Sequence, residues 1–133
     1  MMVLVDTSVW VDFFAGRSVP HVGHLERLIA EGEELCTCGI VLVELLQGIR
    51  DDRQHRRVRA YLHELIYLDL PRETYLQAAD IYRALCSRGI RIRNTVDCLI
   101  AACCIRHGAF LLHNDRDFEA IAGRWPLRTA TAP

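Results

Sequence analysis

The chain has 133 residues, of which 51% are hydrophobic and 25% are charged, and its formal net charge is −1. This composition excludes a disordered chain and a uniformly basic nucleic-acid coat. No stretch reaches the ~20 apolar residues of a membrane helix, and the start of the chain lacks the basic segment of a signal peptide. We therefore expect a cytoplasmic protein without a membrane anchor, folded as one domain over residues 1–133.

Short apolar runs alternate with segments of helical periodicity. Residues 2–5, 34–37, 66–70 and 109–113 are predicted strands, and residues from Pro126 onward are a predicted tail or edge strand. Thr7 or Ser8 is expected to cap a first short helix, and further helices are predicted at 22–31, 40–49, 52–65, 71–88, 96–107 and 116–122. Strands that alternate with helices predict right-handed crossovers and a three-layer α/β/α domain with a central, mainly parallel sheet.

The six cysteines do not form a pattern typical of a metal site. Neither Cys36-Thr37-Cys38 nor the adjacent Cys103 and Cys104 has the spacing of zinc ligands. A chain this rich in apolar residues needs no disulfides, so we expect reduced thiols that serve mostly as small core residues.

Four acidic side chains occupy positions that converge in such a fold. Asp6 follows the first predicted strand, and Asp115 follows the last apolar strand with one residue between. Both are therefore expected at the carboxyl edge of the sheet, where open α/β folds place their sites. Asp97 lies in the first turn of an apolar helix, and Glu44 is the single charge between Gly39 and Ile49.

Each acid also has a structural explanation. Asp6 and Asp115 can cap helices or form turns, and Asp97 can interact with a helix dipole. Glu44 requires a partner, because an isolated carboxylate on a buried helix costs several kcal/mol; an arginine would satisfy it.

Taken together, the four carboxylates favour a bound cation. Crowded carboxylates repel one another unless a positive charge lies among them, and the chain contains no lysine. Oxygen ligands without cysteine or histidine spacing favour Mg²⁺ or Mn²⁺. Such an ion suits phosphodiester hydrolysis by a water molecule. The missing lysine also excludes a P-loop nucleotide-binding protein and the phosphatase classes that use lysine at the same edge.

Four segments of the chain, in this order, resemble the PIN-domain ribonucleases, in particular the VapC-like toxins of type II toxin–antitoxin pairs. They are Val5-Asp6-Thr7-Ser8-Val9-Trp10, Val43-Glu44-Leu45-Leu46-Gln47-Gly48, Asp97-Cys98-Leu99-Ile100-Ala101-Ala102 and His113-Asn114-Asp115-Arg116-Asp117-Phe118. The resemblance covers essentially the whole chain and implies a PIN-like fold.

The resemblance also implies roles for individual residues. Asp6, Glu44, Asp97 and Asp115 would be the catalytic and metal-binding quartet around Mg²⁺ or Mn²⁺. Asp117 would be an accessory acid or an ordinary helix residue, and Ser8 would hold Asp6 or a water molecule, cap a helix, or do both. The implied partners are an inhibitory antitoxin, whose C-terminal segment wraps the toxin and can send a basic side chain into the acidic pocket, and a second copy of the chain in a homodimer.

The arginines and His113 admit two explanations each. Arg88, Arg91 and Arg93 precede Asp97 and would bind RNA phosphates or form surface ion pairs. His113 precedes the turn of Asp115, and we favour a structural role over substrate binding or proton donation.

Our interpretation is a toxin that cleaves structured RNA, such as tRNA or rRNA, as an Mg²⁺- or Mn²⁺-dependent endoribonuclease. Two alternatives stay open at this point: a catalytically idle PIN-like module that binds RNA or protein, and a metal-dependent DNA nuclease.

Overall fold

A central parallel sheet organises the computed structural model, which describes residues 1–130. The strand order is β3-β2-β1-β4-β5, and every neighbouring pair is parallel. Val3, Leu4 and Val5 in the central strand are fully buried, as expected for a parallel sheet covered on both faces. The strands are β1 (Met2–Val5), β2 (Glu34–Cys38), β3 (Ile66–Leu68), β4 (Phe110–Leu112) and β5 (Arg128–Thr129).

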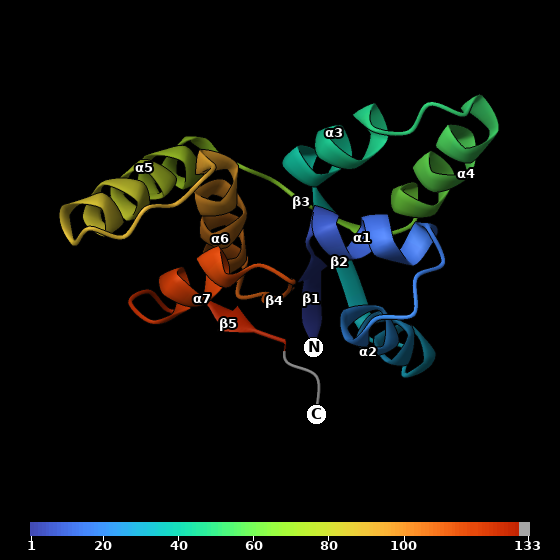
Figure 1. Cartoon of the computed structure of the whole chain (residues 1–133), viewed down its shortest axis with the longest axis horizontal. Coiled ribbons are helices and arrows are strands. Elements are labelled where there is room, and N and C mark those ends of the chain that lie inside the picture. Colours follow the sequence, from blue (N-terminus) through green and yellow to red (C-terminus); the bar gives the residue numbers. More distant parts are fainter. Residues whose placement is uncertain (131–133) are drawn as a thin grey trace.

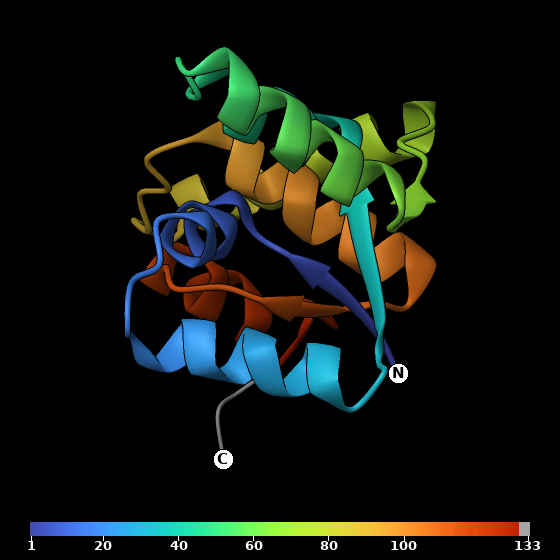
Figure 2. The same ribbon diagram turned by 90° about the vertical axis from the view of Figure 1, so that its right-hand side faces the viewer.

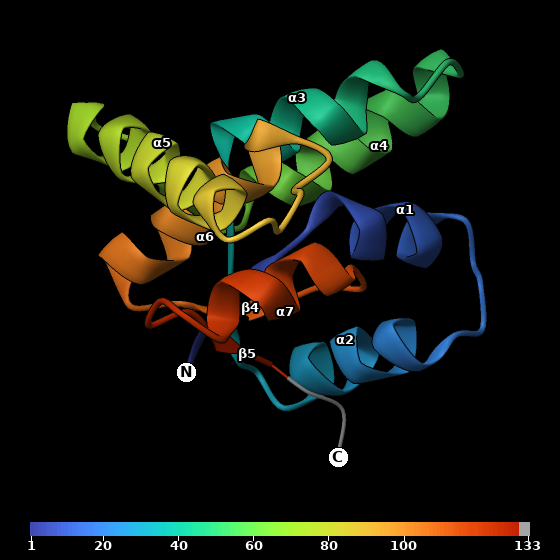
Figure 3. The same cartoon turned by 60° about the vertical axis from the view of Figure 1, so that its left-hand side comes forward.

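Helices cover both faces of this sheet and complete the three layers that the sequence predicts. In Figure 1, α1 to α4 lie on one side of the strands and α5 to α7 on the other. Figure 2 looks onto the first group, and Figure 3 brings the second group forward, with α5 packed on the outside of α6. The helices are α1 (Thr7–Phe14), α2 (Pro20–Ala30), α3 (Gly39–Gln47), α4 (Asp52–His63), α5 (Arg72–Ser87), α6 (Thr95–His107) and α7 (Arg116–Ala122).

The order in which the chain adds strands to the sheet reverses between β1 and β4, which are neighbours in the sheet. After β1 the chain continues toward β2 on one side, whereas after β4 it continues toward β5 on the other. The two strands are in register at Val5 and Leu112, and the Asp6 backbone N–H donates to the Leu112 carbonyl at 2.9 Å. Open α/β sheets form their binding crevice at the carboxyl ends of such a strand pair. Asp6 and Asp115 lie there.

Several boundaries differ from those predicted. Asp6, and neither Thr7 nor Ser8, is the N-cap of α1, because its side chain accepts the Ser8 backbone N–H. The α2 helix begins at Pro20, which is favoured in a first turn because it needs no hydrogen-bond acceptor there. Strands β3 and β4 are shorter than the predicted 66–70 and 109–113, because β3 ends before Asp69 and β4 extends only from Phe110 to Leu112.

The state of the cysteines and the absence of a membrane-spanning helix among the described residues agree with the predictions from the sequence. All six thiols are free; five of them are buried, and Cys86 is exposed. Within residues 1–130, no helix combines the length and the apolar composition that a membrane span requires.

Candidate metal centre

Asp6 is held at the end of β1 by the first turn of α1. Its Oδ2 accepts hydrogen bonds from the Ser8 hydroxyl at 2.6 Å and from the Ser8 backbone N–H at 3.2 Å. Burial raises the pKa of Asp6, although the hydrogen bonds from Ser8 favour the ionised form and oppose that effect. Ser8 therefore contacts Asp6 and orients its carboxylate.

Glu44 projects from α3 toward the same edge of the sheet. The Thr7 hydroxyl donates a hydrogen bond to its Oε1 at 2.8 Å. Burial raises the pKa of Glu44 and the charge of Asp6 adds to this, while the Thr7 hydrogen bond lowers it. In this structure Glu44 is therefore paired with a neutral hydroxyl and has no arginine partner among the described residues.

Asp97 lies in the first turn of α6, which Asn94 caps by accepting the Val96 backbone N–H at 3.0 Å. Burial, together with the charges of nearby carboxylates, raises its pKa to about 7, and none of the described residues donates a hydrogen bond that opposes the effect. The next contributions all come from neighbouring carboxylates: Asp6, Asp115, Asp117 and Glu44. Asp97 is therefore at the centre of the acidic group.

Asp115 and Asp117 belong to the turn that opens α7. Asp115 caps this helix, and its Oδ1 accepts the Asp117 backbone N–H at 3.0 Å. Asp97, Asp115 and Asp117 each offer an oxygen atom, and these atoms lie within 4.8 Å of one another. Three carboxylates from two helices therefore converge on a space that one cation could fill.

Arg93 is the one basic side chain among residues 1–130 within 4.0 Å of these acids. Its Nη2 lies 3.3 Å from Asp115 Oδ2, and its Nε lies 3.7 Å from Asp117 Oδ2. The side chain is 76% exposed, so water screens the pair and leaves the guanidinium free to move. Of the two explanations for Arg93, the surface ion pair is the one that describes its position in this structure.

The residues present fit a hard divalent cation. All the donors are carboxylate or hydroxyl oxygens, which suit Mg²⁺ and Mn²⁺ better than softer metals. A single exposed arginine faces the five carboxylates of Asp6, Glu44, Asp97, Asp115 and Asp117. Besides burial, the charges of the other four acids raise the pKa of Asp97.

The structure brings together all the acids that the sequence singles out, with two differences. Asp117, expected only as an accessory acid, lies in the closest group with Asp97 and Asp115. Asp6 and Glu44 flank that group, near enough to raise the pKa of Asp97. Which of these side chains bind metal stays a prediction.

Sequence reasoning missed the contact of Thr7 with Glu44 and the contacts of His113. The Asp115 backbone N–H donates to His113 Nδ1 at 3.1 Å, so the other ring nitrogen, Nε2, carries the proton and faces Glu119 Oε1 at 3.1 Å. Burial lowers the pKa of His113. This side chain supports the turn of Asp115, as the structural explanation holds, and the one signal for it was its position two residues before Asp115.

Comparison with known sequences gives a consistent result along the whole chain. The family model described as PIN domain matches residues 3–124. Ribonuclease VapC11 of Mycobacterium tuberculosis is 36% identical over 132 residues, which cover 98% of each sequence.

Solved structures show the same fold. The VapBC2 structure from Rickettsia felis, bound to a promoter DNA fragment, matches with a TM-score of 0.77 and 24% identity over 98% of each chain. VapC20 of Mycobacterium tuberculosis, described as a sarcin-ricin loop cleaving toxin, matches with a TM-score of 0.70 and 24% identity over 95% of this chain and 98% of that chain.

Proposed function

This chain belongs to the PIN-domain family, among the VapC ribonucleases, and from that membership we propose how its carboxylates cleave RNA. It is a ribonuclease and the toxin of a toxin–antitoxin pair. The substrate we propose is a phosphodiester bond in structured RNA. The observation that carries the proposal is the convergence of Asp97, Asp115 and Asp117 beside Asp6 and Glu44. We also propose that residues 1–133 act as one nuclease domain.

Mg²⁺ or Mn²⁺ is the cofactor that this donor set favours. Asp97, Asp115 and Asp6 would hold it, with Asp117 completing the group. When bound, the cation would polarise the phosphate, acidify a water molecule and shield the negative charge that develops during attack.

The side chains of the protein have distinct tasks in this scheme. Ser8 keeps Asp6 in one orientation through two hydrogen bonds. Thr7 occupies Glu44 Oε1, which leaves Oε2 to orient the attacking water and accept its proton. The raised pKa of Glu44 makes it a stronger base than an exposed glutamate. Arg93 moves from Asp115 to a substrate phosphate, because a guanidinium binds phosphate in a bidentate way.

The direct test is cleavage of RNA by the purified protein. We expect products with Mg²⁺ or Mn²⁺, none in EDTA, and recovery when the metal is returned. Asp6→Asn and Asp97→Asn should abolish cleavage without unfolding the protein, whereas Asp80→Asn, at an exposed position on α5, should leave it unchanged. Full activity of either site variant would refute the assignment.

The same assay separates the two alternatives. A binding module would retain RNA but yield no metal-dependent product. A DNA nuclease would cleave a DNA strand of the same sequence in preference to the RNA, whereas our proposal predicts preference for RNA.

An antitoxin is the partner indicated by the toxin–antitoxin complexes that share this fold. We propose that its C-terminal segment wraps this chain and places a basic side chain among the carboxylates, in competition with the metal. We propose a homodimer as the state of the free toxin. Inhibition by the co-purified antitoxin and light scattering of the toxin alone test these two statements.

A further inference from the structure

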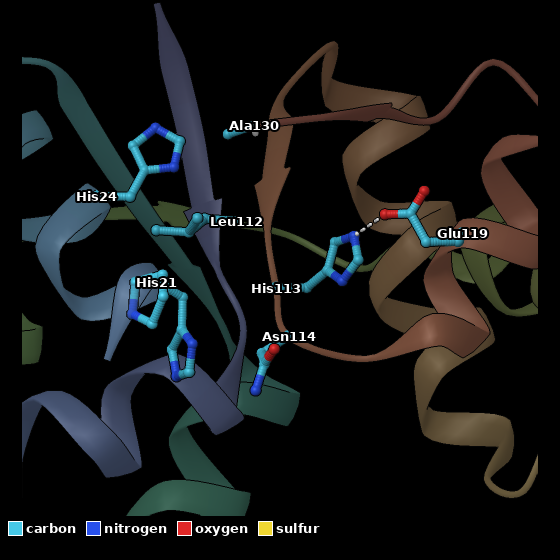
Figure 4. Close-up of a pocket in the computed structure, with 8 residues that line it drawn as sticks. His21, His24, Leu112, His113, Asn114, Glu119 and Ala130 are labelled. Atoms are coloured by element: carbon cyan, nitrogen blue, oxygen red, sulfur yellow. Dashed lines mark ion pairs between the residues drawn. The ribbon is translucent and has the colours of Figure 1, made fainter. Parts of the chain in front are cut away.

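A pocket of about 270 Å³ lies at the carboxyl ends of β4 and β5. It opens between α2 and the segment that joins β4 to α7 (Figure 4). His21 and His24 come from α2, His113 and Asn114 from the joining segment, and Glu119 from α7. Asn114 immediately precedes Asp115, so the pocket and the acidic centre share one stretch of backbone.

Several polar groups in the pocket lack partners in the described part of the chain. His24 is 7% exposed, and its Nδ1 is buried without a hydrogen bond there. His21 uses Nε2 to contact Asp12 Oδ2 at 2.6 Å, and no contact of its Nδ1 is found within residues 1–130. The exposed Asn114 amide likewise has no side-chain hydrogen bond to the described residues. The pocket thus offers the Asn114 amide and His21 Nδ1 for a ligand, whereas His24 Nδ1 is buried away from it.

The charge of the pocket argues against an anion. Burial lowers the pKa of His24, which favours a neutral ring. The ring nitrogens of His113 face the Asp115 backbone and Glu119, and Glu119 adds negative charge at the rim. None of the described lining residues is an arginine, so a phosphate group would find no permanent cation here.

The shape and chemistry instead suit a flat, uncharged group with a hydrogen-bonding edge. Leu112, Pro20 and Ala130 supply apolar surface next to the amide and imidazole groups. Unpaired nucleobases are recognised in this way, through polar contacts to their edges and apolar or aromatic contacts to their faces. In Figure 4, the Asn114 side chain lies below His113, on the side that faces the ring of His21.

We propose that this pocket binds one unpaired nucleobase of the RNA substrate, next to the phosphodiester that is cleaved. The proposal rests on the proposed ribonuclease function. It assigns Asn114 as a specificity-determining residue, with His21 as a further contact.

One test is the cleavage profile on an RNA pool randomised around the cut. The wild type should prefer one nucleotide at a position flanking the cut. Asn114→Ala and Asn114→Asp should reduce this preference about tenfold, since a polar side chain paired with a base contributes roughly 1–3 kcal/mol of discrimination. Gln47→Ala, which removes an exposed amide at the far end of α3, is the matched control.

A second test does not depend on cleavage. Nucleosides carry no phosphodiester, so their binding can be followed by the NMR signals of the Asn114 side-chain amide and of the His21 ring. Saturable shifts at these signals, weakened by Asn114→Ala, would support the pocket. Unchanged signals at millimolar nucleoside, or an unaltered cleavage profile in both Asn114 variants, would overturn it. Metal-dependent cleavage could persist in either case, so failure of the pocket is distinguishable from failure of the proposed function.

Discussion

Replacing Asp97 with asparagine should stabilise the metal-free protein while it abolishes activity. The asparagine keeps the size of the side chain and removes the charge that burial and four neighbouring carboxylates disfavour. Because the pKa of Asp97 is about 7 instead of the ordinary 3.8, the ionised form costs the folded state up to about 4 kcal/mol. Partial exposure of Asp97 reduces this, so we expect a gain of about 2 kcal/mol in the free energy of unfolding.

The effect should depend on pH with a defined sign. A carboxyl group whose pKa is raised by folding binds protons more tightly in the folded state, so wild-type stability rises as the pH falls through 7 toward 4. At about pH 8 Asp97 is ionised in both the folded and the unfolded protein, and the full cost is present. At about pH 5.5 the folded protein is protonated at Asp97, and the advantage of the variant should fall by about half.

Urea unfolding in EDTA at these two pH values measures the prediction. Asp80→Asn controls for the loss of an exposed helix carboxylate and should change little. Added Mg²⁺ should stabilise the wild type, by about 2.7 kcal/mol at a hundredfold excess over its Kd, and the Asp97→Asn variant much less. If the variant is no more stable than the wild type in EDTA at the higher pH, the electrostatic reasoning about this centre is wrong.

Three further substitutions test individual contacts. Thr7→Val removes the 2.8 Å hydrogen bond to Glu44. We expect the single-turnover rate constant of RNA cleavage to fall about tenfold, the equivalent of one lost hydrogen bond; an unchanged rate constant would show that Thr7 has no role in the reaction. Ser8→Ala removes the hydroxyl bond that favours the ionised form of Asp6, so the acid limb of the pH–rate profile should move to higher pH, and an unmoved limb would contradict this role. Arg93→Gln removes the exposed ion pairs with Asp115 and Asp117. The metal concentration for half-maximal activity should fall about two- to fivefold, while the KM for RNA should rise. A KM for RNA that falls together with this metal concentration would count against a role of Arg93 in phosphate binding.

The convergence of the acids could be predicted because it follows from topology. Asp6 and Asp115 each follow an apolar strand, and parallel strands end at one edge of the sheet. Asp97 could be placed near them because it lies in the first turn of a helix that leads back into the sheet. The order of strands and helices along the sequence is therefore enough to predict that the acids converge, and the orientations of the side chains are not needed.

The contacts within the site could not be predicted, because they depend on side-chain orientations that the order of strands and helices does not determine. The Thr7–Glu44 hydrogen bond joins residues 37 positions apart, and it depends on the crossing of α1 and α3 and on two side-chain rotamers. Asp6, Thr7 and Ser8 are all able to cap a helix, so the choice among them depends on where the strand ends. The position of Asp117 beside Asp97 depends on how α7 leaves the sheet.

The central claim is that these acids form one cation site, and anomalous scattering from crystals grown with Mn²⁺ tests it most directly. We predict a strong manganese peak bonded to carboxylate oxygens of Asp97 and Asp115, with distances of about 2–2.3 Å, and its loss in Asp97→Asn crystals. A peak bound elsewhere, or none at saturating Mn²⁺, would contradict the claim.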